Sequence, residues 1–230
     1  MRIPEKLTFR DIVTLLTINA PVNYTSRNEL DEENYVSCRY MGNAEADAIK
    51  TGTHSTECHY DSSDVGLHFP DTTVNEYYIL EKQRNPVAIE SCIGRISFQM
   101  KVFPCEIPIV HSVYCVLHEY GHWLHFMESG KTTYEYERLE YAARQPYEKT
   151  ANQIRALPDG AYKRILARRY EDEIYSQFPS ERAADEYALK HIVEAVTIIR
   201  DFLGYTEQDL ICSNRHHAPF SIKDEPLSQA

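Results

Sequence analysis

The chain has 230 residues, enough for one large domain with a genuine hydrophobic core. Its formal net charge of −11 argues against a nucleic-acid-binding protein and against docking on an anionic membrane, because both partners are recognised through a basic surface. The sequence contains no run of about 18 apolar residues and no signal-peptide pattern, which predicts a soluble, cytoplasmic protein without a membrane span. It gives no indication of the oligomeric state.

Six cysteines are scattered along the chain without a C-x-x-C pair. A chain of this length does not need disulfide bonds in order to fold. We therefore expect free and mostly buried thiols.

The N-terminal part of the chain has a mixed pattern. Helical periodicity is present in Phe9–Ile18, and the polar stretch Asn34–Phe69 is typical of loops and short strands. Thr73–Leu80 and Ile93–Val102 have β-branched and aromatic residues in partial alternation, which favours strands. A small mixed sheet is therefore expected here. Ser91–Met100 is expected to be either an edge strand beside a cleft, whose free edge could pair with an extended peptide, or an interior strand.

From Ile109 onward the pattern is helical. Gly130 is well placed as a left-handed C-terminal cap, Pro146 is expected to interrupt a helix, and Ser180 is expected to be an N-cap. The whole chain, 1–230, is predicted to form one α+β domain with a largely helical C-terminal half. The expected helices are Ile109–Met127, Thr132–Leu157, Gly160–Phe178 and Glu181–Leu203, the last ended by Gly204.

The pentapeptide His118-Glu119-Tyr120-Gly121-His122 carries the strongest chemical signal. Residues four apart lie one helical turn above another, so His118 and His122 present two imidazoles on one face. Glu119 lies roughly 100° around the helix, where it can reach a water on a shared metal without ligating the ion. The pattern predicts a hydrolytic zinc centre; the alternative is a pair of hydrogen-bonded core histidines.

A glycine inside this helix costs about 1 kcal/mol relative to alanine. Gly121 therefore indicates that another element packs closely against the helix. The segment Glu181-Arg-Ala-Ala-Asp185-Glu-Tyr-Ala offers small residues for such an approach, with two carboxylates one turn apart. Glu181 is the candidate third zinc ligand and Asp185 the candidate partner for the free ring N–H of a ligating histidine. The alternative is a solvated acidic face near a helix N-terminus.

Together, H-E-Y-G-H and E-R-A-A-D-E-Y-A resemble the gluzincin metallopeptidase pattern H-E-x-x-H…E-x-x-x-D. The second segment is also similar to motifs of ImmA/IrrE-like peptidases and of the CAAX-protease/HtpX-like family. The resemblance implies a zincin-like domain with one zinc ion, ligated by His118, His122 and Glu181, with Glu119 as general base and Asp185 as partner of a ligand histidine. The 58 residues between the two motifs predict a helical insertion at about 131–178.

Other polar residues are weaker candidates. His125 shares the face of His118 and is an alternative third ligand, a cleft-lining residue or, as we favour, a partly buried polar contact. His54, Cys58 and His59 resemble a second metal cluster, but without a matching partner pair elsewhere the pattern is better explained by loop histidines. In gluzincins a downstream residue donates to the developing oxyanion, and spacing does not choose among the candidates here. These candidates are His191, Tyr187, Tyr205, His216 and His217.

The sequence thus predicts a zinc metallopeptidase that hydrolyses a protein or peptide substrate, with the attacking water activated by Glu119. Two other functions remain open. One is a regulatory or interaction protein with a zincin fold and little turnover. The other is a zinc amidase that acts on a non-protein amide.

Overall fold

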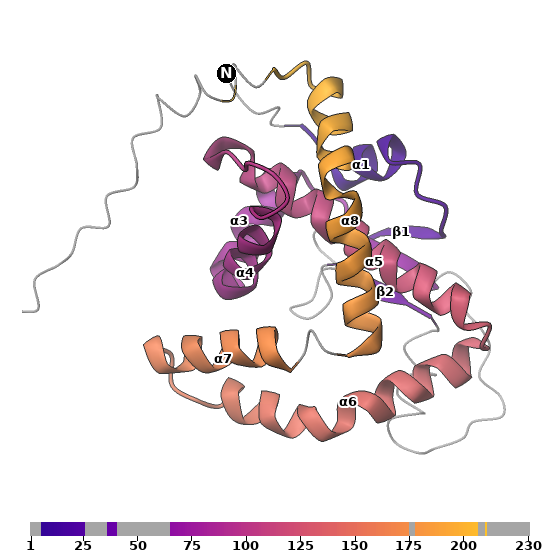
Figure 1. Ribbon diagram of the computed structural model, residues 1–230, viewed down its shortest axis with the longest axis vertical. Coiled ribbons are helices and arrows are strands. Elements are labelled where there is room, and N and C mark those ends of the chain that lie inside the picture. Colours follow the sequence, from indigo (N-terminus) through magenta and orange to yellow (C-terminus); the bar gives the residue numbers. More distant parts are fainter. Residues whose placement is uncertain (1–5, 26–35, 41–64, 175–177, 207–209, 211–230) are drawn as a thin grey trace, which may run out of the picture.

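The computed structural model describes residues 6–25, 36–40, 65–174, 178–206 and 210 (Figure 1). The N-terminal part contains α1 (Phe9–Leu15), β1 (Val22–Thr25), β2 (Ser37–Arg39), β3 (Gly66–Pro70), α3 (Val74–Arg84) and α4 (Pro86–Ile96). A single 3-10 turn, η2 (Pro104–Glu106), leads into α5 (Ile107–Ser129). The remaining helices are α6 (Thr133–Arg155), α7 (Ala161–Glu173) and α8 (Pro179–Phe202).

The three described strands form a mixed sheet with the order β1-β3-β2. The parallel pair β1–β3 aligns Val22 with Leu67, and the antiparallel pair β2–β3 aligns Cys38 with Leu67. All five residues of β3 are buried, as expected for a central strand. The predicted α+β class, with a small mixed sheet and a helical C-terminal half, is confirmed for the described residues.

Helix α5 is the centre of the hydrophobic core. It contacts α1, α3, α4, β3 and, most extensively, α8, which crosses it in Figure 1. Val110, Val113 and Val116 of α5 are fully buried. Helix α8 contributes a stripe spaced by three and four residues, the spacing of a single helical face, which comprises Ala184, Ala188, Ile192, Val196 and Ile199.

A buried ion pair joins the C-terminal part of α8 to the residue just before α5. Arg200 of α8 donates from Nε and Nη2 to the two carboxylate oxygens of Glu106, at 3.0 and 2.7 Å. Glu106 is only 2% exposed, so its charge is compensated by this bidentate contact. The pair fixes the C-terminal part of α8 beside the start of α5.

Two predicted strands are wrong. Thr73–Leu80 falls on α3, where Thr73 and Glu76 form a capping box. Most of Ile93–Val102 falls on α4 and the turn that follows it, with Asn85 as N-cap and Pro86 in the first helical turn. These start signals outweigh the local β-propensity of the residues that follow them. Ser91–Met100 is therefore not an edge strand.

The C-terminal helices largely match the predicted ones. They differ in the interior of α6 and at the start of α8. Helix α6 runs without a break through Pro146. Helix α8 begins after Phe178 with Pro179 in its first turn, and the Ser180 hydroxyl donates to Glu140 instead of capping the helix. Gly130 and Gly204 have positive φ values of 62° and 67°, as expected after helix ends.

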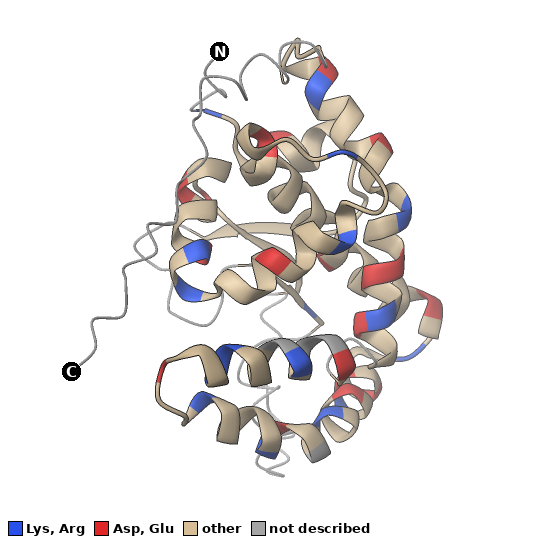
Figure 2. Ribbon diagram, turned by 60° about the vertical axis from the view of Figure 1, so that its left-hand side comes forward, with Lys and Arg blue, Asp and Glu red and all other residues tan. Residues whose placement is uncertain are grey.

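Helices α6 and α7, together with the connections around them, cover the predicted insertion at about 131–178. They lie side by side as a pair at one end of the molecule in Figures 1 and 2. Acidic and basic residues are interspersed along the helices (Figure 2). No helix in the described part of the chain is both long and apolar enough to cross a membrane.

Candidate metal centre

Helix α5 places the rings of His118 and His122 one above the other, as their four-residue spacing requires. Their Nε2 atoms lie 3.1 Å apart. Glu181, in the first turn of α8, brings its Oε2 atom to 3.3 Å from each of these nitrogens. The three residues are the group of possible metal ligands found among the described residues.

The distances between these three atoms, which we call the donor triangle, can be compared with those of a tetrahedral metal site. Two donors bound tetrahedrally at about 2.0–2.1 Å from a zinc ion lie roughly 3.3–3.4 Å apart. The observed separations of 3.1, 3.3 and 3.3 Å are close to that edge length. The three donors, the group found among the described residues, therefore fit three corners of a tetrahedral metal site.

The close packing of α5 and α8 makes the triangle possible. A Cβ atom placed on Gly121 would lie 2.7 Å from the Cα atom of Ala184, a backbone atom that cannot move aside. Gly121 lies between the two histidines, and Ala184 lies one turn beyond Glu181. The glycine expected to allow a close approach therefore does so at the level of the donor triangle.

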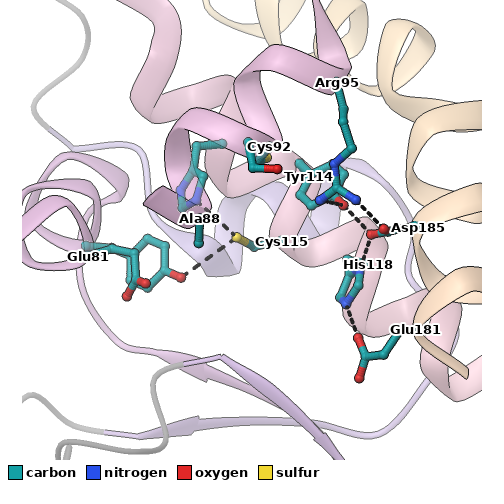
Figure 3. Close-up of a pocket in the computed structure, with 12 residues that line it drawn as sticks. Glu81, Ala88, Cys92, Arg95, Tyr114, Cys115, His118, Glu181 and Asp185 are labelled. Atoms are coloured by element: carbon teal, nitrogen blue, oxygen red, sulfur yellow. Dashed lines mark hydrogen bonds and ion pairs between the residues drawn. The ribbon is translucent and has the colours of Figure 1, made fainter. Parts of the chain in front are cut away.

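Asp185 orients one of the histidines. Its Oδ1 atom accepts from Nδ1 of His118 at 3.0 Å, which leaves Nε2 of that ring directed at Glu181 (Figure 3). The Arg95 guanidinium and the Tyr114 hydroxyl also donate to the Asp185 carboxylate. Burial raises the pKa of Asp185, but His118, Tyr114 and Arg95 outweigh it and lower the pKa below its ordinary value.

The same contacts determine the charge of His118 in the metal-free protein. Burial disfavours the imidazolium, but hydrogen bonds to Asp185 and Glu181 outweigh burial and raise the pKa of His118 to about 10. A metal ion at Nε2 must displace that proton.

Arg144 of α6 contacts Glu181, which the sequence did not predict. Its Nη2 atom donates to Oε1 of Glu181 at 2.7 Å and to Glu140 at 3.4 Å. Oε1 is thus held by Arg144 while Oε2 faces the imidazoles, an orientation that favours ligation through one oxygen. Burial raises the pKa of Glu181, but the two histidines and Arg144 lower it well below its ordinary value. Arg144 belongs to an ordinary helical charge pattern, so its sequence position gives no hint of this role.

Glu119 and the donor triangle open into one cavity of about 380 Å³. One wall contains β2, an outer strand among the three that the structure describes, with Ser37 and Cys38, and another wall is α6, with Glu140 and Arg144. Glu119 therefore shares the cavity with the three donors without belonging to the ligand group. The strand beside the cavity is β2, not the segment Ser91–Met100 expected from the sequence.

His125 points to a different environment. Its Nδ1 atom lies 2.5 Å from the hydroxyl of Tyr136, beside a small cluster formed by Tyr40, Phe126 and Tyr136. It does not belong to the ligand group and does not line the cavity. The interpretation of His125 as a partly buried polar contact fits this placement.

The described oxyanion-donor candidates do not line the cavity that contains Glu119. Tyr187 packs on Tyr120 and on the ring of His191, with centroid distances of 5.6 and 4.5 Å. Tyr205 follows the C-terminal end of α8, whereas Glu181 is in the first turn of that helix. None of the three lines the cavity at Glu119. His216, His217, His54, Cys58 and His59 lie outside the described residues.

The thiols agree with the expectation of free cysteines where the structure describes them. Cys38, Cys92, Cys105 and Cys115 are all free, and Cys92 is buried. Cys58 and Cys212 lie outside the described residues.

Comparisons with protein-family models, with curated proteins and with solved structures each give no match.

Proposed function

We propose that the protein is a single-zinc metallopeptidase that hydrolyses amide bonds in a protein or peptide, as the gluzincin resemblance implies. The observation that carries the proposal is the donor triangle of His118, His122 and Glu181 beside a carboxylate, Glu119, in the same cavity. Two imidazoles and one carboxylate form a donor set typical of catalytic zinc.

A zinc ion bound by these residues would polarise the scissile carbonyl and acidify the attacking water. The protein's own residues supply the proton transfers. Glu119 accepts the proton of the water and then passes it to the leaving amine, a general acid–base role that requires a carboxylate within hydrogen-bond reach. Asp185 and Arg144 hold His118 and Glu181 in their ligating orientations.

The position of β2 supports an extended substrate. Among the described strands it has an outer place in the order β1-β3-β2, and Val36, Ser37 and Cys38 line the cavity that contains Glu119. An extended peptide can add to such an edge through main-chain hydrogen bonds, which provides affinity with little demand on side chains. A peptide bound along β2 would pass beside Glu119.

The decisive experiment compares Glu119→Gln with His122→Ala in a peptide-library cleavage assay, with zinc content measured in parallel. Glutamine is nearly isosteric with glutamate but cannot accept the proton, so Glu119→Gln should retain zinc and lose about 10²–10⁴-fold in activity. His122→Ala should lose zinc and activity together.

The outcomes separate the competing functions. Full turnover by zinc-loaded Glu119→Gln would refute the mechanism. If the wild-type protein cleaves no substrate, and both variants still bind the same partner as the wild type, the protein is a regulatory or interaction protein. Metal-dependent cleavage of simple amides but of no peptide would identify an amidase.

A further inference from the structure

A closed network of hydrogen bonds lies behind His118, around the carboxylate of Asp185 (Figure 3). Arg95 of α4 donates from Nη1 to Oδ2 of Asp185. From Nη2 the same guanidinium donates to the hydroxyl of Tyr114 at 3.1 Å. The Tyr114 hydroxyl in turn donates to Oδ1 of Asp185, the oxygen that also contacts Nδ1 of His118. Side chains from α4, α5 and α8 therefore meet at one carboxylate.

The chemistry of these groups fixes the direction of each hydrogen bond. A guanidinium has only donors and an ionised carboxylate has only acceptors. Because the oxygen of the Tyr114 hydroxyl accepts from Arg95, its single proton is directed at Asp185. The carboxylate has no proton to give, so Nδ1 of His118 is the donor in its contact with Oδ1. The neutral ring then carries its lone pair on Nε2, the nitrogen that faces Glu181.

Packing holds the network in place. Tyr114 lies one helical turn before His118 on α5, and their rings are stacked with centroids 5.8 Å apart. The guanidinium carbon of Arg95 lies 5.7 Å from the centroid of the Tyr114 ring. The four side chains also line a cavity of about 220 Å³. Tyr114 is 6% exposed and the Asp185 side chain 14%, so water competes little for the carboxylate.

The other candidate ligand histidine has no such support in the described part of the chain. Nδ1 of His122 is buried and has no hydrogen-bond partner among the described residues. The described residues thus provide a hydrogen-bonded anchor on the Nδ1 side of the His118 ring and not on that of the His122 ring. The orientation of His118 is therefore the one that depends on a network of side chains.

Asp185 by itself would hold the ring less firmly. A carboxylate turns easily about its Cβ–Cγ bond, but turning Oδ1 away from His118 would here also break the contacts with Arg95 and Tyr114. We infer that Arg95 and Tyr114 are positioning residues of the metal centre, whose guanidinium and hydroxyl act on His118 through Asp185. They hold the carboxylate so that His118 keeps its proton on Nδ1 and presents Nε2 to the metal. The inference rests on the proposed function for its zinc ion, but not for turnover.

Two variants remove these contacts while leaving charge and packing nearly unchanged. Tyr114→Phe keeps the stacked ring and loses only the hydroxyl. Arg95→Lys keeps the positive charge, but a compact ammonium cannot make the paired contacts of a planar guanidinium. The matched controls are Tyr120→Phe, on the same helix as Tyr114, and Arg182→Lys, on α8 with a side chain that is 68% exposed.

The first measurement is the zinc affinity of the full chain, determined by competition against a fluorescent chelator. Tyr114→Phe and Arg95→Lys should each weaken zinc binding by about three- to tenfold, the equivalent of one hydrogen bond, and the controls should not. In the background of Asp185→Ala neither should have a further effect, because the residue through which they act is then missing.

A second measurement does not depend on the folding of Asp185→Ala. In the zinc-loaded protein, long-range proton–nitrogen NMR spectra should show the His118 ring protonated on Nδ1 and bound to zinc through Nε2. Exchange of the Nδ1 proton with solvent should be about tenfold faster in Tyr114→Phe and Arg95→Lys, because the carboxylate can then turn away. Both controls should exchange at the wild-type rate.

Each outcome has a separate meaning. Wild-type affinity and exchange in either variant, or losses that add fully to that of Asp185→Ala, would overturn the positioning role and leave the peptidase proposal in place. The expected losses in affinity and faster exchange, without cleavage of any peptide by the wild type, would retain the positioning role and overturn the peptidase.

Discussion

Two helical pairs contribute to the candidate metal centre. Helices α5 and α8 carry the three donors, helix α6 of the pair α6–α7 contributes Arg144, and the two pairs are packed differently. Helices α5 and α8 are long, bury apolar faces against each other and approach closely enough for Gly121 to touch the Ala184 backbone. Helices α6 and α7 are also amphipathic, but Tyr136 is the single buried residue among their described side chains. Both pairs nevertheless contribute to the site, because Arg144 of α6 binds Glu181.

The difference separates two kinds of contribution. The α5–α8 pair fixes the donor positions through rigid packing, since a packed core resists displacement of its side chains. The α6 helix contributes a charged side chain that reaches the site from a largely solvated element. We therefore expect changes in α5–α8 to affect both folding and metal binding, and changes in α6 to affect metal binding mildly.

The largest effect should come from substitutions of two helical glycines. Gly121→Ala places a Cβ atom against the Ala184 backbone, and such overpacking costs about 1–3 kcal/mol. Gly94→Ala in α4 meets no atom within 4 Å and should gain up to about 1 kcal/mol of helix propensity. Urea unfolding should therefore show opposite signs for the two variants, with zinc content reduced only in Gly121→Ala. Equal stabilisation by both would show that α5 and α8 do not pack as described.

The next effect concerns the carboxylate behind His118. Asp185→Ala removes the acceptor for Nδ1 and should weaken zinc binding by about 10- to 100-fold. Glu186→Ala is the matched control, because Glu186 is exposed and its contact with Arg182, at 3.7 Å, is worth little. Competition against a fluorescent chelator measures both affinities. Equal affinities would return Asp185 to the helix surface.

A smaller effect is expected from α6. Arg144→Ala should weaken zinc binding by less than about tenfold, because its side chain is 37% exposed and solvent screens part of its charge. Arg138→Ala, an exposed position on the same helix, serves as control. A loss greater than that of Asp185→Ala would mean that α6 is as rigid a part of the site as α8.

The smallest expected effect is the release of about one proton when zinc binds. Because the pKa of His118 is about 10 in the metal-free protein, zinc binding at pH 8 should release about one proton from this ring. Calorimetry in buffers with different ionisation enthalpies measures the number. Asp185→Ala should reduce the release, since that carboxylate helps to raise the pKa; an unaltered enthalpy across buffers in the wild type would contradict the assignment.

The same pKa has a consequence for the stability of the metal-free protein. The folded pKa of His118 exceeds its ordinary value of 6.5, so the charged imidazole stabilises the folded state. That contribution is complete below pH about 6.5 and is lost as the pH rises to about 10. Thermal unfolding of the chelator-treated protein between pH 6.5 and 10 should show the loss, and zinc-loaded protein should not.

Much of this molecule follows from local sequence signals. The period of apolar residues in α5 and α8, and the glycines after them, predict both helices and their ends. The spacing of His118 and His122 by itself places two imidazoles on one face, because a helical turn is fixed by backbone geometry. Gly121, Ala184 and Ala188 also indicate close packing, since small residues on a helix face allow backbones to approach. For these features, local and long-range preferences agree.

Other features depended on the tertiary structure. Thr73–Leu80 and Ile93–Val102 have β-branched residues typical of strands, yet caps before them and packing against α5 select helices. Arg144 meets Glu181 across 37 residues, and β2 lies beside Glu119 although it precedes the motif helix by a long stretch of chain. No periodicity records such contacts, because the relative placement of elements is determined by how their apolar faces pack together. The sequence by itself therefore determined which residues could hold a metal, and only tertiary packing decided what orients them and which cavities open beside them.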